Sequence, residues 1–159
     1  MKTQKTTDET RVISALQQEL ANTFLLYANY KKYHWESYGP FFRDLHLLFD
    51  EHGQAVHGLI DELGERIRIL GGVAGADPRA WAERGTVRIA EGKQTMAGML
   101  TEALENHQRV INGHRAAIAI ATDENDPGTA DLFTRNIQLH EKQAWFLREI
   151  LEKSDGLLK

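Results

Sequence analysis

Apolar residues recur every three or four positions along most of the chain, and this spacing predicts four long helices. They are expected over residues 8–37, 40–70, 95–122 and 126–153. Thr7 or Asp8 is a suitable cap for the first helix, and Pro40 suits the first turn of the second. Gly71-Gly72 ends the second helix, and Asp126-Pro127 opens the fourth.

The connection between the second and third long helices has roughly 22 residues, which is longer than usual in a helical bundle. Within it, Asp77-Pro78 predicts the cap and first turn of a short helix that continues to about Glu83. This short helix is expected to cover the middle of the long helix before it. The elements together predict an all-α, four-helix bundle with one short extra helix, formed as a single domain by residues 1–159, with a short flexible tail over 1–7.

The composition is that of one soluble globular domain, with 159 residues, 42% apolar and 26% charged. No apolar run approaches about 18 residues, so no membrane span is expected, and Met1–Thr10 lacks the apolar stretch of a secretory signal. The absence of cysteine excludes disulfides and thiol catalysis and agrees with a cytoplasmic location. The net charge of −4 argues against a protein built to coat nucleic acid.

Five side chains of metal-ligating type lie in the first half of the chain: His34, His46, Asp50, Asp61 and Glu65. His46 and Asp50 are four residues apart, as are Asp61 and Glu65, so each pair lies on one helix face. Mixed imidazole and carboxylate ligands suit ferrous iron, manganese or zinc, and zinc is a competitor for iron at such a site. Taken singly, the histidines are more typical of caps or interfaces than of metal sites, and the carboxylates are typical of a solvated surface.

The spacing along the second helix limits where a metal ion can bind. His46 and Asp61 are fifteen residues apart, which is roughly 22 Å along a helix axis. One ion does not span that distance, since ligand bonds are about 2 Å long. Either the histidine end of the helix hairpin and the carboxylate end are unrelated, or they meet when two copies of the chain pair antiparallel about a twofold axis. Such pairing would give two equivalent sites per dimer. The chain has no Glu-x-x-His motif, and this absence favours the shared site over one inside a single bundle.

Four other histidines are interpreted as surface, core or interface residues and are not included among the ligands. His57 lies on the same stripe as Asp61 and is expected to be exposed or to lie behind the ligands. His107, His114 and His140 are expected to be core or interface histidines, because no carboxylate partner accompanies them in the sequence.

Five short motifs surround the candidate ligands: Tyr33-His34-Trp35, Gly39-Pro40-x-Phe42, Leu45-His46-x-x-Phe49, Asp61-x-x-x-Glu65-Arg66-Ile67 and Leu70-Gly71-Gly72. Their order and spacing resemble the signature of the Dps family, the mini-ferritins. The likeness continues at residues 129–132 and 140–142 and so covers nearly the whole chain. The resemblance implies a hollow shell of twelve four-helix subunits that oxidises ferrous iron, with hydrogen peroxide as the preferred oxidant, and stores ferric mineral, protecting against oxidative stress.

The resemblance also implies roles for particular residues. Two iron ions are expected at a site between subunits, with four ligands carried over from the family: His34, His46, Asp61 and Glu65. Asp50 is expected as an additional or bridging ligand near the second ion. Trp35 is expected either to trap oxidising equivalents beside the iron or to pack in the interface.

An acidic pore for iron entry is expected where the family places it, near the turn before the last helix. Asp131 is the first candidate and Asp123 the second; Asp126 also lies in this cluster but is the obvious helix cap.

Two other functions stay open beside the ferroxidase. DNA binding in the family usually rests on a lysine-rich tail, but Lys2 and Lys5 are balanced here by Asp8 and Glu9, so only weak DNA binding is expected. The alternatives are therefore a non-enzymatic, DNA-binding nucleoid shell and a structural helical bundle clipped by zinc.

Overall fold

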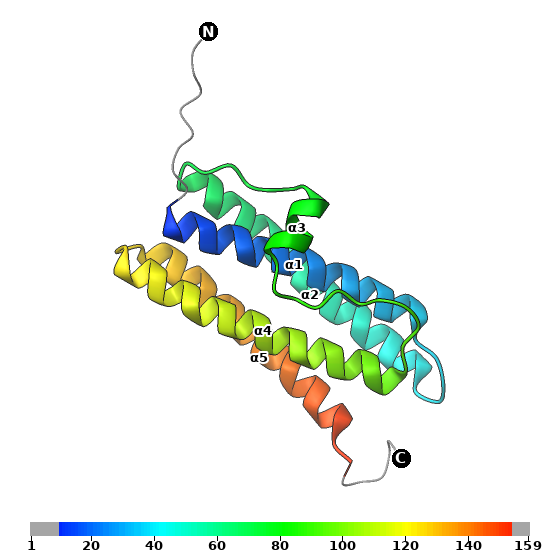
Figure 1. Ribbon diagram of the computed structural model, residues 1–159. Helices are drawn as coiled ribbons and strands as arrows, with labels where there is room; N and C mark the ends of the chain where they lie inside the picture. Colours follow the sequence, from blue (N-terminus) through cyan, green and yellow to red (C-terminus); the bar gives the residue numbers. More distant parts are fainter. Residues whose placement is uncertain (1–9, 154–159) are drawn as a thin grey trace.

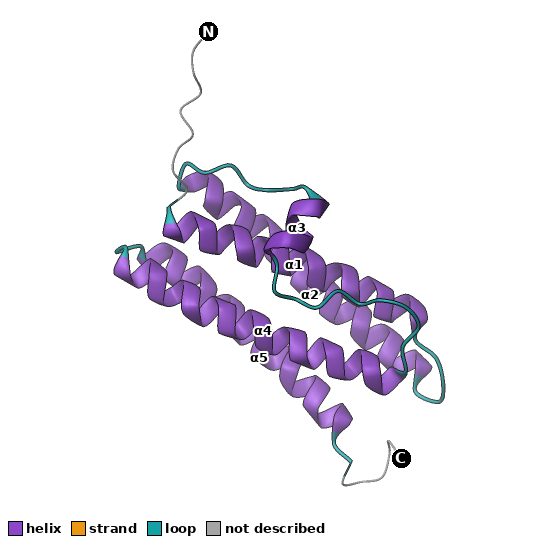
Figure 2. Cartoon of the chain, in the orientation of Figure 1, coloured by secondary structure: helices purple, strands orange, loops and turns teal. Residues whose placement is uncertain are grey.

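The computed structural model describes residues 10–153, and this part of the chain consists of helices and loops without a strand (Figures 1 and 2). The helices are α1 (Arg11–Glu36), α2 (Phe42–Ile69), α3 (Pro78–Arg84), α4 (Met96–Asp123) and α5 (Pro127–Leu151). The pairs α1–α2 and α4–α5 are tightly packed hairpins, and α1 packs on α4 to join them. The all-α fold with a short extra helix is confirmed. The predicted tail over 1–7 lies outside the described residues.

Side-chain caps explain where four of the helices begin. The hydroxyl of Thr95 accepts a hydrogen bond from the Gly98 amide at 3.0 Å, and the Asp126 carboxylate accepts one from the Thr129 amide at 3.0 Å. Asp77 accepts from the Arg79 amide at 3.0 Å and opens α3, as predicted.

Two predicted helix starts are wrong. The first helix begins at Arg11 instead of Asp8, because the Thr10 hydroxyl accepts from the Ile13 amide and caps it there; the predicted caps Thr7 and Asp8 lie outside the described residues. The second begins at Phe42, after Pro40. Gly39 takes a φ of +87°, and its carbonyl accepts from the Phe42 amide at 3.0 Å, so Pro40 belongs to a tight turn.

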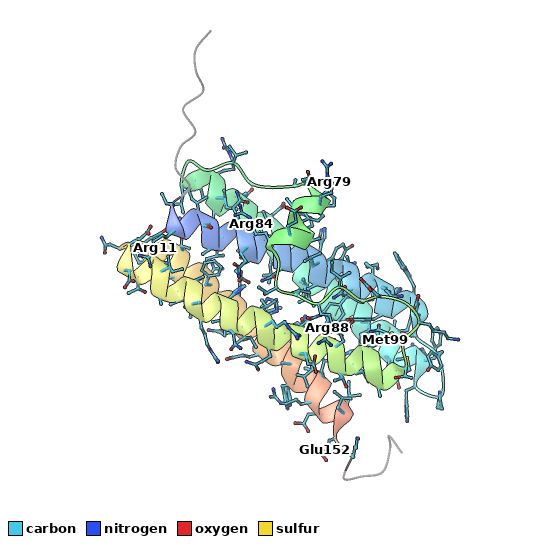
Figure 3. The ribbon with its side chains drawn as sticks, viewed as in Figure 1. Arg11, Arg79, Arg84, Arg88, Met99 and Glu152 are labelled. Atoms are coloured by element: carbon cyan, nitrogen blue, oxygen red, sulfur yellow. The ribbon has the colours of Figure 1, made fainter. Side chains whose placement is uncertain are left out.

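Short helix α3 packs on α1 and not, as predicted, on the middle of α2. The Trp81 ring stacks on Phe24 of α1 with centroids 3.9 Å apart and planes 10° apart. Arg79 and Arg84 lie on α3, over the α1 side of the bundle, and Arg88 lies on the segment that follows α3, next to α4 (Figure 3). The prediction failed because helical periodicity does not show which of two neighbouring helices a loop crosses.

Three asparagines hold the segment 86–90, which joins α3 to α4. The Asn22 side-chain oxygen accepts from the Thr86 amide at 2.6 Å, and that of Asn29 accepts from the Ala90 amide at 2.9 Å. Asn106 accepts from the Arg88 amide at 2.8 Å and donates to the Arg88 carbonyl at 2.9 Å. Because Asn22 and Asn29 belong to α1 and Asn106 to α4, the segment is bonded to both hairpins.

The core has two apolar clusters and a set of buried polar side chains, called here the polar layer. One cluster includes Tyr30, Tyr33 and Phe49, near the α1–α2 turn, and the other includes Ile67 and Phe133, near the opposite end. The residues of the polar layer are Glu19, His52, His107, His114, Asn136, His140 and Gln143. The core assignment of three of these histidines is thereby confirmed. No helix in residues 10–153 is long and apolar enough to cross a membrane.

Candidate metal centre

His34 and His46 form a stacked pair across the α1–α2 turn. Their ring centroids are 3.7 Å apart and the planes differ by 22°. Each Nδ1 lies 2.8 Å from the backbone carbonyl oxygen of the other residue. A carbonyl only accepts, so both Nδ1 atoms carry a hydrogen, and in the neutral imidazole the lone pair is then on Nε2. This is the tautomer that a metal-ligating histidine needs, with the ring oriented by the bond at its other nitrogen.

The sequence produces this pair through a short turn between two long helices. His34 lies in the last turn of α1, and His46 lies just inside α2. The Ser37 hydroxyl donates to the Tyr33 carbonyl at 2.8 Å and ends α1, and Gly39 supplies the positive φ that reverses the chain. The spacing of twelve residues thereby places the two rings one above the other.

Asp50 lies one helical turn beyond His46 and is held by a lysine from the facing helix. Lys31 Nζ is 3.1 Å from Asp50 Oδ1, and this hydrogen bond lowers the pKa of the Asp50 carboxyl. Asp50 is therefore ionised and available as a ligand, but a metal ion has to compete with Lys31 for it.

Exposed aromatic side chains surround the histidine pair. The Trp35 side chain is 71% exposed, and the Phe42 ring lies 5.0 Å from the His46 ring. Tyr38 and Phe41 are also exposed in the same turn. A concentration of large apolar groups on a surface is typical of an interface with another protein.

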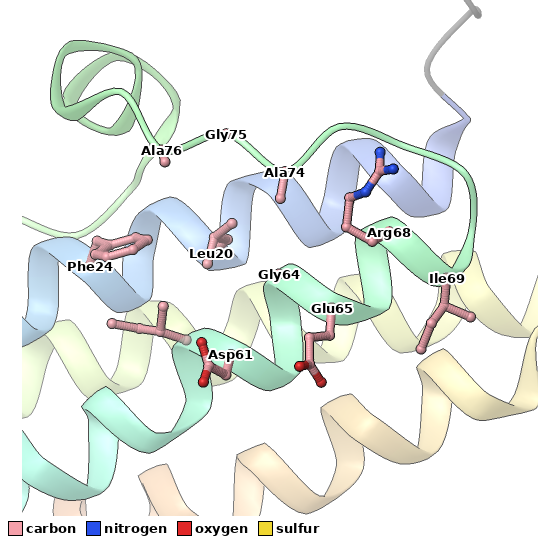
Figure 4. A pocket seen from close by; sticks show the side chains of 11 residues that line it. Leu20, Phe24, Asp61, Gly64, Glu65, Arg68, Ile69, Ala74, Gly75 and Ala76 are labelled. Atoms are coloured by element: carbon pink, nitrogen blue, oxygen red, sulfur yellow. The ribbon is translucent and has the colours of Figure 1, made fainter.

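Asp61 and Glu65 lie one turn apart on the exposed side of α2, at the edge of a hollow of about 520 Å³ (Figure 4). Leu20 and Phe24 of α1 line the hollow opposite them, and residues 74–76 lie along its rim. Arg66, the residue after Glu65, bonds to Asp126 and Thr129, at 2.6 and 2.9 Å.

The two halves of the candidate site remain apart within one chain. Helix α2 is continuous from Phe42 to Ile69, so the axial separation of His46 and Asp61 is roughly 22 Å, as predicted. Residues 10–153 contain no group of three or more histidine, aspartate or glutamate side chains placed to hold a metal ion. His57 is exposed, with its ring 4.9 Å from Tyr27.

Comparison with known proteins shows which family has this architecture. The model of the ferritin-like domain matches residues 13–157. The structure of Dps from Thermosynechococcus elongatus superposes with a TM-score of 0.91, at 48% identity over 94% of this chain and 95% of that one. DpsC from Streptomyces coelicolor gives a TM-score of 0.87, at 39% identity over 90% and 84% of the two chains. DNA protection during starvation protein 1 of Deinococcus radiodurans is 36% identical over 89% of this chain and 69% of its own length.

The chain belongs to the Dps family of ferritin-like proteins. The resemblance seen in the motifs around His34, His46, Asp61 and Glu65 is thus confirmed at the level of the family.

The three aspartates of this Dps-family chain that were considered for the pore lie near the α4–α5 turn and differ in their exposure and contacts. Asp126 caps α5 and bonds to Arg66; burial alone would raise its pKa, but the bonds from Thr129 and Arg66 outweigh burial and lower it. Asp131 is exposed and 3.1 Å from Arg135, and Asp123 is exposed and 3.7 Å from Arg11, which Figure 3 places at this end of the bundle. Of these three, Asp123 and Asp131 are exposed to solvent, whereas Asp126 is partly buried.

Sequence reasoning missed two buried glutamates. Glu19 Oε2 lies 3.0 Å from His114 Nδ1, so His114 does have a carboxylate partner, contrary to expectation; it comes from α1, 95 positions away in the chain. Glu102 accepts a hydrogen bond from the Tyr33 hydroxyl at 2.6 Å. The burial of Glu19 could have been predicted from its position in the sequence, because it lies on the apolar stripe that contains Leu16 and Leu20.

Proposed function

We propose that the chain is a ferroxidase of the Dps family, which oxidises ferrous iron at a site shared by two subunits and stores the ferric product in a shell of twelve. One observation carries the proposal: two histidines oriented to bind metal meet at the α1–α2 turn, and two exposed carboxylates lie further along α2. Each pair is an incomplete site, and His46 and Asp61 are roughly 22 Å apart along the helix axis. A twofold axis brings the histidine end of one subunit to the carboxylate end of its partner.

The donor set fits iron as a substrate. Nε2 of His34 and of His46 would bind a ferrous ion. The anionic oxygens of Asp61 and Glu65 would keep the ion bound when it is oxidised to the ferric state. Asp50 would bind a second ion more weakly, because its carboxylate already accepts a hydrogen bond from Lys31. Hydrogen peroxide takes one electron from each of two ferrous ions and two protons from solvent, and leaves as two water molecules. Paired oxidation therefore avoids release of a one-electron oxidant.

The acidic residues after α4 would draw ferrous ions toward the shell interior. Asp131 and Asp123 are exposed, and carboxylates gathered around a symmetry axis raise the local concentration of cations. Asp126 is assigned to capping α5 instead, since its oxygens are already bonded.

Mixed assembly of two inactive variants tests the shared site. The first variant is His34→Ala/His46→Ala, and the second is Asp61→Ala/Glu65→Ala. Each alone should assemble but oxidise ferrous iron only at the uncatalysed rate, because each keeps half of every site. After co-refolding, a mixed dimer has one intact site, so part of the activity should return.

Glu51→Ala is the matched control, since it removes an exposed carboxylate of α2 next to Asp50 and should leave oxidation unchanged. Mixed particles that form without recovering oxidation would contradict the shared site. Wild-type rates in the Asp61→Ala/Glu65→Ala variant alone would contradict the ligand assignment.

Two other functions predict different behaviour. A nucleoid-binding shell would retain duplex DNA at about 150 mM salt, whereas a chain of net charge −4 neutralises few phosphates and is expected to leave DNA unshifted in a gel. A zinc-clipped bundle would bind zinc without oxidising iron. Ferrous iron is added anaerobically and peroxide follows, while iron oxidation and particle size are measured together. Iron oxidation by the protein would distinguish a ferroxidase from the nucleoid-binding shell and from the zinc-clipped bundle.

A further inference from the structure

Two separate groups of buried side chains are joined by hydrogen bonds in the middle of the bundle. In the first group, Glu19 Oε2 of α1 lies 3.0 Å from His114 Nδ1 of α4. In the second group, His107 of α4 has two partners: its Nε2 lies 2.5 Å from the Tyr30 hydroxyl, and its Nδ1 lies 2.9 Å from His140 Nδ1 of α5. All five side chains are buried, so each of their polar atoms depends on a partner inside the core.

The two groups approach each other at the rings of His114 and His140. The ring centroids are 5.5 Å apart and the planes differ by 75°, so one ring meets the other edge to face. Within residues 10–153, Nε2 of each ring has no hydrogen-bond partner, although both side chains are fully buried. A buried polar atom without a partner costs free energy, so the two nitrogens together point to a small polar ligand between the rings.

His140 Nε2 requires a partner in either arrangement of the ring hydrogens. Burial lowers the pKa of His107 to about 3 and that of His140 well below its usual value, so near pH 7 each ring is neutral and carries one hydrogen. If His107 donates to His140, the hydrogen of His140 is on Nε2 and requires an acceptor. If His140 donates instead, its Nε2 carries a lone pair and requires a donor. A ligand that both donates and accepts satisfies either arrangement.

A water molecule has the required chemistry and size. Two hydrogen bonds of about 2.9 Å that meet at a tetrahedral oxygen span about 4.7 Å between the two nitrogens, which suits rings with centroids 5.5 Å apart. Asn136 lies one turn before His140 on α5, and its Nδ2 is a further buried atom without a partner in the described part of the chain. Buried waters usually have about three partners. An amide nitrogen donates and does not bind a cation, so this set of groups favours water over a metal ion.

We propose that an ordered water molecule binds in the core between His114 Nε2 and His140 Nε2, with Asn136 Nδ2 as its third partner. The water joins the two groups into one hydrogen-bonded network that extends from Glu19 to Tyr30. It thereby connects α5 to the Glu19–His114 contact, which otherwise joins only α1 and α4. The site is independent of the proposed function, because none of the candidate metal ligands belongs to it.

A crystal structure of the assembled protein, at a resolution that shows ordered solvent, tests the site. A peak without anomalous signal is expected within about 2.7–3.2 Å of Nε2 of both His114 and His140. Asn136→Leu removes the third partner with little change in side-chain volume and leaves both hydrogen-bonded groups intact, so the peak should weaken or disappear. Asn112→Leu is the matched control, because it removes an exposed amide of α4 and should preserve the peak.

Solid-state NMR of the assembled protein, labelled with nitrogen-15 at histidine, gives a second readout that needs no variant. Magnetisation from water should reach Nε2 of His114 and of His140 at short mixing times. Transfer to His107 should be several-fold weaker, because both of its nitrogens are bonded to side chains of the core.

Three results would overturn the proposal: no peak between the rings in the wild type, an anomalous metal peak there, or a direct hydrogen bond between His114 and His140. Equal water transfer to all three core histidines would also contradict a single bound water. An unchanged peak in Asn136→Leu would overturn the assignment of the third partner. If Asn136→Leu does not fold, the wild-type crystal and the NMR experiment still decide whether the water is bound.

Discussion

The imidazoles of His34 and His46 each carry a hydrogen on Nδ1, and this position leaves Nε2 as the nitrogen that can bind metal. The ligand types can be read directly from the sequence, and helical periodicity predicts that His46 and Asp50 share one helix face. The hydrogen positions could not be predicted, since they depend on carbonyl groups twelve residues away across a turn. Lys31 was missed for the same reason, because its contact with Asp50 exists only once α1 and α2 pack together.

Lys31 should weaken metal binding at Asp50. Replacing Lys31 with methionine removes the competing cation while keeping the length of the side chain, so a divalent ion should bind more tightly by a few-fold. Anaerobic titration with cobalt(II), followed by its absorption spectrum, measures the change. Lys32→Met is the control, because Lys32 loses the same charge but pairs with Glu36 at 2.7 Å. Equal tightening in both variants would show a general charge effect and no competition at Asp50.

At the scale of helices, side-chain caps could be located from the sequence where a Pro or a periodic apolar run followed them, as at Asp77 and Asp126. The start of α1 was misplaced because Thr7, Asp8 and Thr10 are all suitable caps, and local sequence does not rank them. The partner of α3 was missed because stacking of Trp81 on Phe24 is a tertiary contact.

Two helical glycines should respond in opposite ways to alanine. A Cβ at Gly113 would come within 2.3 Å of Glu19 Oε1, a buried carboxylate bonded to His114, so Gly113→Ala should destabilise the subunit by about 1–3 kcal/mol. A Cβ at Gly58 on α2 would meet nothing within 4 Å, so Gly58→Ala should stabilise by up to about 1 kcal/mol through helix propensity. Guanidinium denaturation measures both free energies of unfolding. Effects of the same sign would contradict the close approach of α1 to α4 at Gly113.

At the scale of the whole subunit, the polar layer in the core ties stability to pH. Burial lowers the pKa of His52 to about 4 and that of His107 to about 3, and it also lowers the pKa of His140 well below its usual value. Above the unfolded value of about 6.5 these rings are neutral in both states and contribute no pH dependence. Below it the unfolded chain binds protons that the folded core does not, so stability falls as the pH falls.

Each of these histidines should remove about 2 kcal/mol of stability between about pH 7 and pH 5. Denaturation curves at the two pH values measure the total. His107→Gln should reduce the difference, whereas His57→Gln should preserve it, since His57 is exposed. A pH-independent free energy of unfolding over this range would show that the core histidines already carry protons in the folded state.

Iron uptake by the assembled shell should depend on the exposed acidic residues after α4. Asp131→Asn removes a carboxylate that faces solvent, so it should slow uptake at low salt, and added salt should diminish the difference. Asp126→Asn is the contrasting variant: it mainly weakens the contact with Arg66 and should lower stability more than uptake. Stopped-flow measurement of ferrous consumption at two ionic strengths checks both. Unaltered uptake in Asp131→Asn and Asp123→Asn would place the entry route elsewhere.

The three asparagines that hold residues 86–90 have a consequence for the register of the two hairpins. Apolar ridges on a helix repeat with every turn, so hydrophobic packing alone tolerates a slide of α4 along α1 by about 5.4 Å. Asn22, Asn29 and Asn106 bond to fixed backbone groups of one short segment, and such a slide would break the bonds on one side of it. The segment thus selects a single alignment from several of similar apolar content. The candidate ligands all belong to α1 and α2, so this alignment determines where the second hairpin, with its acidic turn, lies relative to them.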